Sequence, residues 1–287
     1  TDRPEVTTAA IAATTRAMAQ GVPGISGLHL EGPHLSVARK GAHDGDLIRP
    51  MLEADVAELL AAKAALPVLK ITIAPESVSP EQVARLARAG ILVSLGHTDA
   101  DFDTCQDYAR AGARCATHLF NAMSQLTNRA PGLVGAVLST PALSAGLIAD
   151  GIHVHPSSLR AAWAAKAQAG PGRIFLVSDA MAVAGTDLQG FALGGRQIRR
   201  DKGRLRLADG TLAGADLDLT RAIAVLTGQA GVPLGQALAD PDRRRTMGSA
   251  GRAKVCAGYN ITSEAARLSS LFTSTTRQGP RPAKRPE

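Results

Sequence analysis

The sequence predicts an α/β fold on a parallel sheet, most specifically a TIM-type (β/α)8 barrel. About six short, apolar and β-branched stretches alternate with helical ones, which is typical of strand–helix units that pair in parallel. Polar side chains follow several of these strands directly, and barrel enzymes carry their catalytic groups at this end of their strands. Neither G-x-G-x-x-G nor G-x-x-x-x-G-K-[ST] occurs, which disfavours a nucleotide-binding sheet.

The first half of the chain gives the clearest elements. Residues 5–20 are Ala-rich with one apolar helical face, and Gly21 follows as a helix-ending glycine. A Gly-Pro pair and further glycines in residues 32–50 predict a long loop on the C-terminal side of the first strand. We expect strands at 25–30, 66–73, 91–95 and 114–117, and helices at 5–20, 51–65, 80–89 and 99–111.

Helix boundaries in this half follow from local chemistry. Ser79-Pro80 predicts a helix start with proline near the first position. Asp99 is the predicted cap of the next helix, which should stop at Gly112.

The alternation continues in the second half and then breaks. We expect strands at 145–149 and 173–177 and helices at 156–169 and 217–226. Residues 191–213 instead alternate apolar and polar side chains around Gly194-Gly195 and Asp209-Gly210, which predicts a β-hairpin.

Composition indicates a globular protein with ample core material, because 45% of the 287 residues are hydrophobic and 20% are charged. No apolar run approaches the roughly 18–20 residues of a membrane span, so no membrane partner is expected. The three cysteines show no C-x-x-C spacing and predict reduced thiols and a cytoplasmic protein: Cys105, Cys115 and Cys256.

The net charge of +7 is concentrated near the C-terminus, where residues 239–287 hold ten Lys/Arg and four Asp/Glu. A nearly neutral body disfavours a nucleic-acid partner. We expect three segments: a barrel over residues 1–238, a divergent helical segment over 239–272, and a disordered basic tail over 273–287.

Three predicted strands end in metal-ligating side chains. The first ends at Glu31, and two others are followed by His97 and His118. Parallel strands bring these ends to one edge, where one carboxylate and two imidazoles with a fourth position open would suit catalytic Zn²⁺ or a similar ion. A single histidine at a strand end is, however, more often packed or solvated.

Other polar residues have competing interpretations. Asp179, after the strand at 173–177, could cap a turn or serve as a general base. His153 and His155 form an H-x-H pair that offers a second metal hypothesis, although Pro156 ends the strand there. His29 is interpreted as a core residue or a support for the metal site.

Cationic loop residues are equally ambiguous. Arg39-Lys40 and Arg129 could be solvated loop charges or could bind an anionic substrate.

Six motifs in order resemble the N-acetylglucosamine-6-phosphate deacetylase family of the amidohydrolase superfamily. They are Gly27-Leu-His-Leu-Glu31-Gly-Pro33, Lys40-Gly-Ala-His43, Gly96-His97-Thr98, Thr117-His118-Leu-Phe-Asn121-Ala-Met123, Asp150-Gly-Ile-His153 and Ser178-Asp179-Ala180. The resemblance implies a metallo-dependent hydrolase barrel that removes the acetyl group of N-acetylglucosamine 6-phosphate. It covers about residues 5–238.

The resemblance also implies roles for individual residues. Glu31, His97 and His118 would hold the metal, Asp179 would be the general base and acid, and His153 would polarise the carbonyl. The implied contacts to the sugar phosphate are Ala42, His43, Asn121, Ala122, Arg129 and His153, and the implied lining of the sugar pocket is Leu212, Ala213 and Gly214. Arg129 and His153 would reach across a homodimer interface.

Departures from the family shape the remaining expectations. The first barrel strand with its H-x-H pair and the β-sandwich do not precede Thr1, so we expect an incomplete barrel with one divalent ion. Zn²⁺ is the first choice, with Fe²⁺, Co²⁺ or Mn²⁺ as alternatives. Beyond about residue 238 the chain instead resembles the C-terminal helix of GT-B glycosyltransferases. The alternative functions are a catalytically defective barrel fragment, or an amidohydrolase acting on a related phosphorylated amino sugar.

Overall fold

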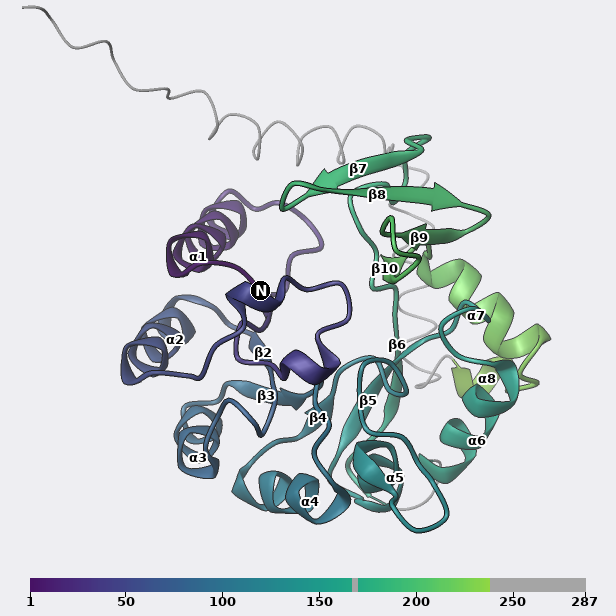
Figure 1. Cartoon of the computed structure of the whole chain (residues 1–287), viewed down its shortest axis with the longest axis horizontal. Helices are drawn as coiled ribbons and strands as arrows, with labels where there is room; N and C mark the ends of the chain where they lie inside the picture. Colours follow the sequence, from purple (N-terminus) through teal and green to yellow (C-terminus); the bar gives the residue numbers. More distant parts are fainter. Residues whose placement is uncertain (167–169, 238–287) are drawn as a thin grey trace, which may run out of the picture.

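The computed structural model describes residues 1–166 and 170–237, and within them a six-stranded parallel sheet curls inside an arc of helices (Figure 1). The strands are Leu28–Glu31 (β1), Leu69–Ile73 (β2), Leu92–Leu95 (β3), Cys115–Ala116 (β4), Ser144–Ile148 (β5) and Ile174–Val177 (β6). This architecture is the predicted α/β fold of TIM type.

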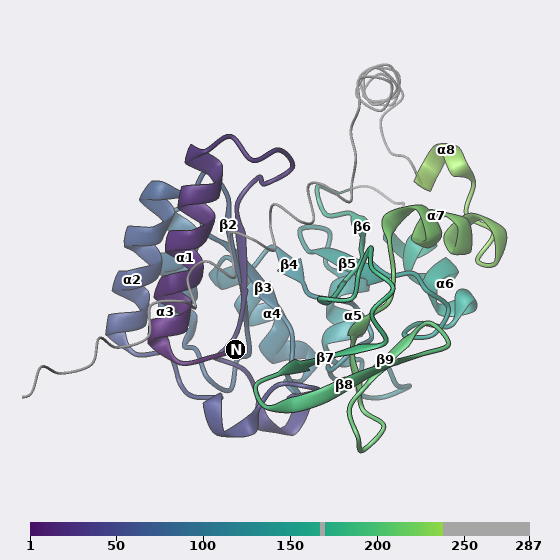
Figure 2. The ribbon, with the colours of Figure 1, turned by 90° about the horizontal axis from the view of Figure 1, so that it is seen from above.

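Helices connect the strands and cover the outer side of the sheet (Figures 1 and 2). They are Pro4–Ala19 (α1), Glu53–Ala65 (α2), Pro80–Arg88 (α3), Phe102–Ala111 (α4), Gly132–Ser139 (α5), Pro156–Lys166 (α6), Leu219–Gly228 (α7) and Leu234–Ala237 (α8). Two short 3₁₀ helices, Val37–Arg39 (η1) and Gly45–Leu47 (η2), lie in the loop after β1.

Strand order follows chain order from β1 to β6, and every neighbouring pair is parallel. All six C-terminal ends therefore face the same edge of the sheet. Beyond β6, Ala180 forms a parallel bridge with Ala215, so the chain at Ala215 runs alongside the extension of β6.

The core lies between the sheet and the helices and consists mainly of Leu, Ile, Val and Ala. In β2, Leu69, Ile71 and Ile73 are at most 1% exposed. On the opposite side of the sheet, buried hydroxyl groups hydrogen-bond one another: Thr72 Oγ1 lies 2.6 Å from Thr117 Oγ1, which lies 2.7 Å from Ser94 Oγ. These three hydroxyl groups are thus satisfied within the sheet.

Leu147→Ala should destabilise the protein by roughly 2–5 kcal/mol, because Leu147 in β5 is fully buried and its loss leaves a cavity. The matched control Leu92→Ala removes the same atoms from a side chain that is 37% exposed, and should cost about 1 kcal/mol or less. Denaturant unfolding of both variants tests this, and equal losses would contradict it.

Helix starts follow the expected chemistry, with one correction. Ser79 and Gln82 form a reciprocal capping box at α3, with Pro80 in the first turn. At α4 the cap is Asp101, whose side chain accepts from Thr104 N at 2.8 Å. The prediction that Asp99 caps this helix is wrong, because its carboxylate pairs with Arg39 instead.

The predicted hairpin at 191–213 is larger in the structure. Four antiparallel strands form a second sheet in the order β10-β9-β8-β7. They are Gly190–Leu193 (β7), Arg196–Asp201 (β8), Arg204–Arg206 (β9) and Leu212–Ala215 (β10). Helix α5 was not predicted, since its Gly-rich sequence gives no strong helical signal.

No helix in the described part of the chain is both long and apolar enough to span a membrane.

Candidate active site

Three side chains from the C-terminal ends of β1, β3 and β4 meet at one point. Glu31 is the last residue of β1, and His97 and His118 follow β3 and β4. Glu31 Oε1 lies 3.0 Å from Nε2 of each histidine, and the two Nε2 atoms lie 3.0 Å apart. The structure thus brings together the three residues that the sequence suggested as a ligand set.

A hydrogen bond to the backbone fixes the orientation of the His97 ring. His97 Nδ1 lies 2.9 Å from the backbone oxygen of Arg39, which can only accept, so Nδ1 carries the proton. Nε2 is then the ring nitrogen of His97 that faces Glu31 Oε1 and His118 Nε2. Burial raises the pKa of Glu31, but hydrogen bonds from His118 and His97 outweigh it and hold that pKa well below its usual range.

The donor set fits a divalent cation. Tetrahedral ligands at about 2.0–2.1 Å from an ion are about 3.3 Å apart, close to the 3.0 Å separations found here. An anionic oxygen and imidazole nitrogens are ligands that Zn²⁺ and similar ions accept. The site therefore has the chemistry of a metal centre.

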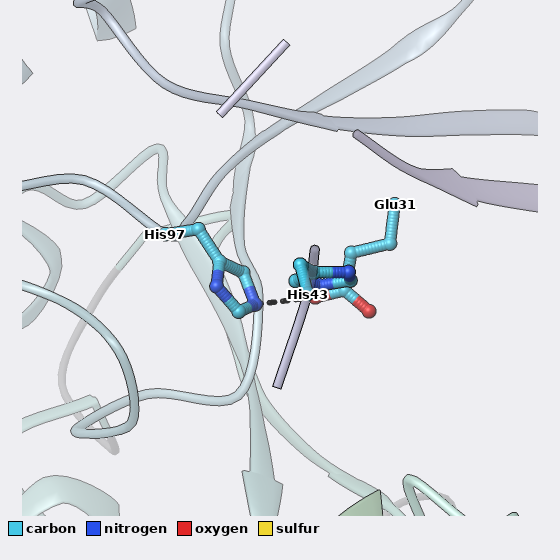
Figure 3. Close-up of side chains that lie close together, drawn as sticks. All are labelled: Glu31, His43 and His97. Carbon is cyan, nitrogen blue, oxygen red and sulfur yellow. Dashed lines mark hydrogen bonds and ion pairs between the residues drawn. The ribbon is translucent and has the colours of Figure 1, made fainter. Parts of the chain in front are cut away.

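His43 lies beside Glu31 and His97 (Figure 3). Its ligating atom lies within 4.8 Å of those of Glu31 and His97, and its ring packs edge-on against His97 with centroids 4.6 Å apart. Burial lowers the pKa of His43 to about 3, so its ring is neutral at physiological pH. The family resemblance implied only a contact between His43 and the sugar phosphate; the geometry also allows His43 to approach a metal ion.

Several residues around the site have left-handed backbone angles that are uncommon outside glycine. The φ values are 50° at His97, 34° at His118, 47° at Ala122 and 48° at Asp179. Such conformations cost free energy and cluster at functional sites. Their gathering at one end of the sheet supports a functional assignment there.

A cavity of about 480 Å³ opens over Glu31, His97 and His118. Every other predicted site residue except one contributes to its wall: Ala42, His43, Asn121, Ala122, His153, Asp179, Leu212, Ala213 and Gly214. The exception is Arg129, which is exposed and does not line the cavity. The wall also includes residues that the sequence did not suggest: Ala38, Gly41, Ile148, Met181, Leu193 and Thr211.

Asp179 follows β6 and is half-buried at the cavity. Within the described residues, no hydrogen bond reaches its carboxylate. Burial raises the pKa of Asp179, which makes this carboxylate a stronger base than a solvated aspartate.

His153 is oriented by Asp150. Its Nδ1 lies 2.6 Å from Asp150 Oδ2, while Asp150 Oδ1 accepts from the backbone N of Ile152 and of His153. Burial raises the pKa of Asp150, but these hydrogen bonds outweigh it and lower the net value. His155 is exposed, and its Nδ1 accepts from Ser157 N, so the two histidines are engaged separately rather than as a pair.

His29 is neither in the core nor attached to the ligand set. Its side chain is exposed, and its Nε2 lies 2.7 Å from Thr72 Oγ1. It therefore joins the hydroxyl groups inside the curl of the sheet.

The chain is similar to known proteins in both sequence and structure. No family model matches the chain. The chain is 45% identical over 223 residues to N-acetylgalactosamine-6-phosphate deacetylase of Shewanella sp. (strain ANA-3), which covers 78% of this chain and 55% of that relative. The chain is a homologue of the N-acetylhexosamine-6-phosphate deacetylases. It spans about half the length of the curated deacetylases it matches.

Solved deacetylase structures share the fold. The crystal structure of N-acetylglucosamine-6-phosphate deacetylase from Pasteurella multocida has a TM-score of 0.78 at 33% identity, covering 83% of this chain and 61% of that one. The Mycobacterium smegmatis deacetylase, as an aspartate-to-alanine variant in complex with N-acetyl-D-glucosamine-6-phosphate, has a TM-score of 0.71 at 31% identity, covering 83% and 64%.

Proposed function

We propose that the protein hydrolyses the acetamide of N-acetylglucosamine 6-phosphate to glucosamine 6-phosphate and acetate, with the aid of a divalent metal ion. The observation that carries this proposal is the meeting of Glu31, His97 and His118 within 3.0 Å at a cavity that also contains Asp179. Names of the homologous proteins supply the substrate class.

Glu31, His97 and His118 would hold one ion, with Zn²⁺ the first choice and Fe²⁺, Co²⁺ or Mn²⁺ as alternatives. When bound, such an ion polarises an amide oxygen and lowers the pKa of water toward about 7. The Nδ1–H of His97, fixed on the Arg39 carbonyl, keeps the Nε2 of that ring directed at the ligand site.

Asp179 would move the proton. Its carboxylate takes a proton from the attacking water and then delivers it to the departing amine nitrogen, so that acetate and a free amine leave. Burial favours this role, because it raises the pKa of the group and strengthens it as a base.

His153 would polarise the substrate carbonyl. The Asp150 carboxylate stabilises a proton on Nδ1, and a second proton on Nε2 would let His153 donate to the amide oxygen. The sugar phosphate would contact Ala42, His43, Asn121 and Ala122, while Leu212, Ala213 and Gly214 would line the sugar pocket.

A galactosamine substrate is the second candidate, because a relative 45% identical to this chain is named for N-acetylgalactosamine 6-phosphate. Comparing kcat/KM for the two epimeric phosphosugars on the same sample distinguishes them. Acetate release together with elemental analysis tests the main proposal. A folded, metal-loaded chain that releases no acetate from either epimer would favour the defective-fragment alternative.

We also propose a homodimer in which Arg129 serves the cavity of the partner subunit, because its side chain is exposed and absent from its own cavity wall. Arg129→Ala should then weaken affinity for the phosphorylated sugar much more than for its unphosphorylated analogue.

Mixing subunits tests this sharing. An equal mixture of Arg129→Ala and Asp179→Asn chains should recover roughly a quarter of parental turnover, because half of randomly formed dimers are mixed and each has one intact site. A mixture no more active than its two components would contradict the shared site.

Several broader assignments stay predictions. They are an incomplete barrel without its first strand and β-sandwich, the segments 1–238, 239–272 and 273–287, and a cytoplasmic location. Residues 238–287 lie outside the described part of the chain. The buried free thiols of Cys105 and Cys115 are compatible with a reducing compartment.

A further inference from the structure

Arg39 occupies an unassigned position in the cavity wall. Arg39 is the only Lys or Arg among the described residues that line the cavity. A sugar phosphate carries about two negative charges at neutral pH and needs a cationic partner when it enters a partly buried site. Within a single subunit, Arg39 is the residue placed to meet that need.

The backbone of Arg39 is attached to the candidate metal centre. Its carbonyl oxygen accepts the Nδ1–H of His97 at 2.9 Å, and Ser36 N donates to the His97 carbonyl at 2.9 Å. Two hydrogen bonds thus fix the 3₁₀ turn η1 on His97. The fold therefore sets the distance between the Cα atom of Arg39 and the side chains of Glu31, His97 and His118.

The guanidinium group is held but not saturated. Its Nε and Nη2 donate to a single oxygen, Asp99 Oδ1, at 2.9 and 2.7 Å. The backbone N of Asp99 in turn donates to Glu76 Oε1 at 2.8 Å, which steadies the anchor. Two of the five N–H groups are used, and the described residues show no partner for the others.

Exposure makes this ion pair easy to extend or exchange. The Arg39 and Asp99 side chains are 38% and 52% exposed, and such pairs contribute little to stability because water screens them. A phosphate dianion could use the free N–H groups without breaking the contact to Asp99.

Resting on the proposed function, we propose that Arg39 is a specificity residue that binds the 6-phosphate of the sugar with its free guanidinium N–H groups. A planar guanidinium can pair two phosphate oxygens at once. The hydrogen bonds between η1 and His97 would then fix the distance between the bound phosphate and the amide that is cleaved. Arg39 thereby selects a phosphorylated sugar over a neutral one.

The test compares Arg39→Gln with Lys40→Gln in the full metal-loaded chain. Lys40 is the adjacent cation, is exposed, and does not line the cavity. Calorimetry measures affinity for glucosamine 6-phosphate and for glucosamine, and acetate release gives KM for the corresponding N-acetylated sugars. Arg39→Gln should weaken binding of the phosphorylated ligand roughly 10- to 100-fold, leaving the neutral ligand and the metal content unchanged. Lys40→Gln should match the parent, and Arg39→Lys should restore part of the loss.

Equal losses for the phosphorylated and neutral ligands would overturn the inference, as would an equal loss in Lys40→Gln. A parent that binds glucosamine and its 6-phosphate alike would overturn it as well. Absence of acetate release from every N-acetylhexosamine phosphate would instead contradict the proposed function, and the binding comparison would still decide the role of Arg39.

Discussion

Asp179→Asn should lower turnover by roughly 10²- to 10⁴-fold, the range for loss of a general acid–base group. The amide that replaces the carboxylate has nearly the same shape but cannot accept the proton of water. Metal content should be unchanged, because Asp179 is not one of the three residues whose side-chain atoms lie 3.0 Å apart. Steady-state kinetics and elemental analysis of one preparation measure both quantities.

A pH profile adds a second readout for Asp179. Burial raises its pKa, so the carboxylate accepts a proton at a higher pH than a free aspartate does. Because the base must be deprotonated, kcat/KM should fall as the pH drops through this raised value. Asp187→Asn is the matched control, since Asp187 lies near in sequence, is exposed and is absent from the cavity wall. Near-parental turnover in Asp179→Asn would remove Asp179 from the mechanism.

The convergence of Glu31, His97 and His118 could be expected from sequence because strand order follows chain order. Parallel strands bring their C-terminal ends to one edge, so polar residues at the ends of β1, β3 and β4 meet despite separations of 66 and 87 positions. Binary patterning was enough to predict the strands of the parallel sheet, and their ends were enough to predict that these three residues lie together.

The roles of residues in the loop after β1 could not be predicted from the sequence. Arg39 places its backbone oxygen on His97 and is one of the residues that line the cavity, and neither role has a sequence signature. Nothing in local spacing tells an arginine that lines a cavity from a solvated one. Asp99 and Asp101 illustrate the same limit: both precede α4, and the long-range contact to Arg39 decides which of them is the cap.

The sequence predicted only a hairpin where the structure has the second sheet, although β10 and the residue before it line the cavity. Thr211, Leu212, Ala213 and Gly214 line the cavity because Ala215 pairs with Ala180 next to Asp179. That pairing joins segments about 35 positions apart in sequence, and its register depends on tertiary packing rather than on turn chemistry.

His118→Ala should abolish stable metal binding. His118 Nε2 is one corner of the triangle with Glu31 Oε1 and His97 Nε2, and its side chain is buried. Without it, two protein ligands remain near the ion, fewer than the three that catalytic Zn²⁺ sites normally use. After dialysis, elemental analysis should find close to one equivalent of metal in the parent and close to none in the variant.

His155→Ala is the control for the loss of a histidine, because His155 is exposed and its side chain bonds only Ser157 N among the described residues. It should retain metal and turnover. His118→Ala should also lose acetate release, since the remaining groups cannot polarise the amide as a cation does. If His118→Ala keeps as much metal as the parent, the ion is held elsewhere. His43, whose ligating atom lies within 4.8 Å of those of Glu31 and His97, would then be the first residue to test as the third ligand.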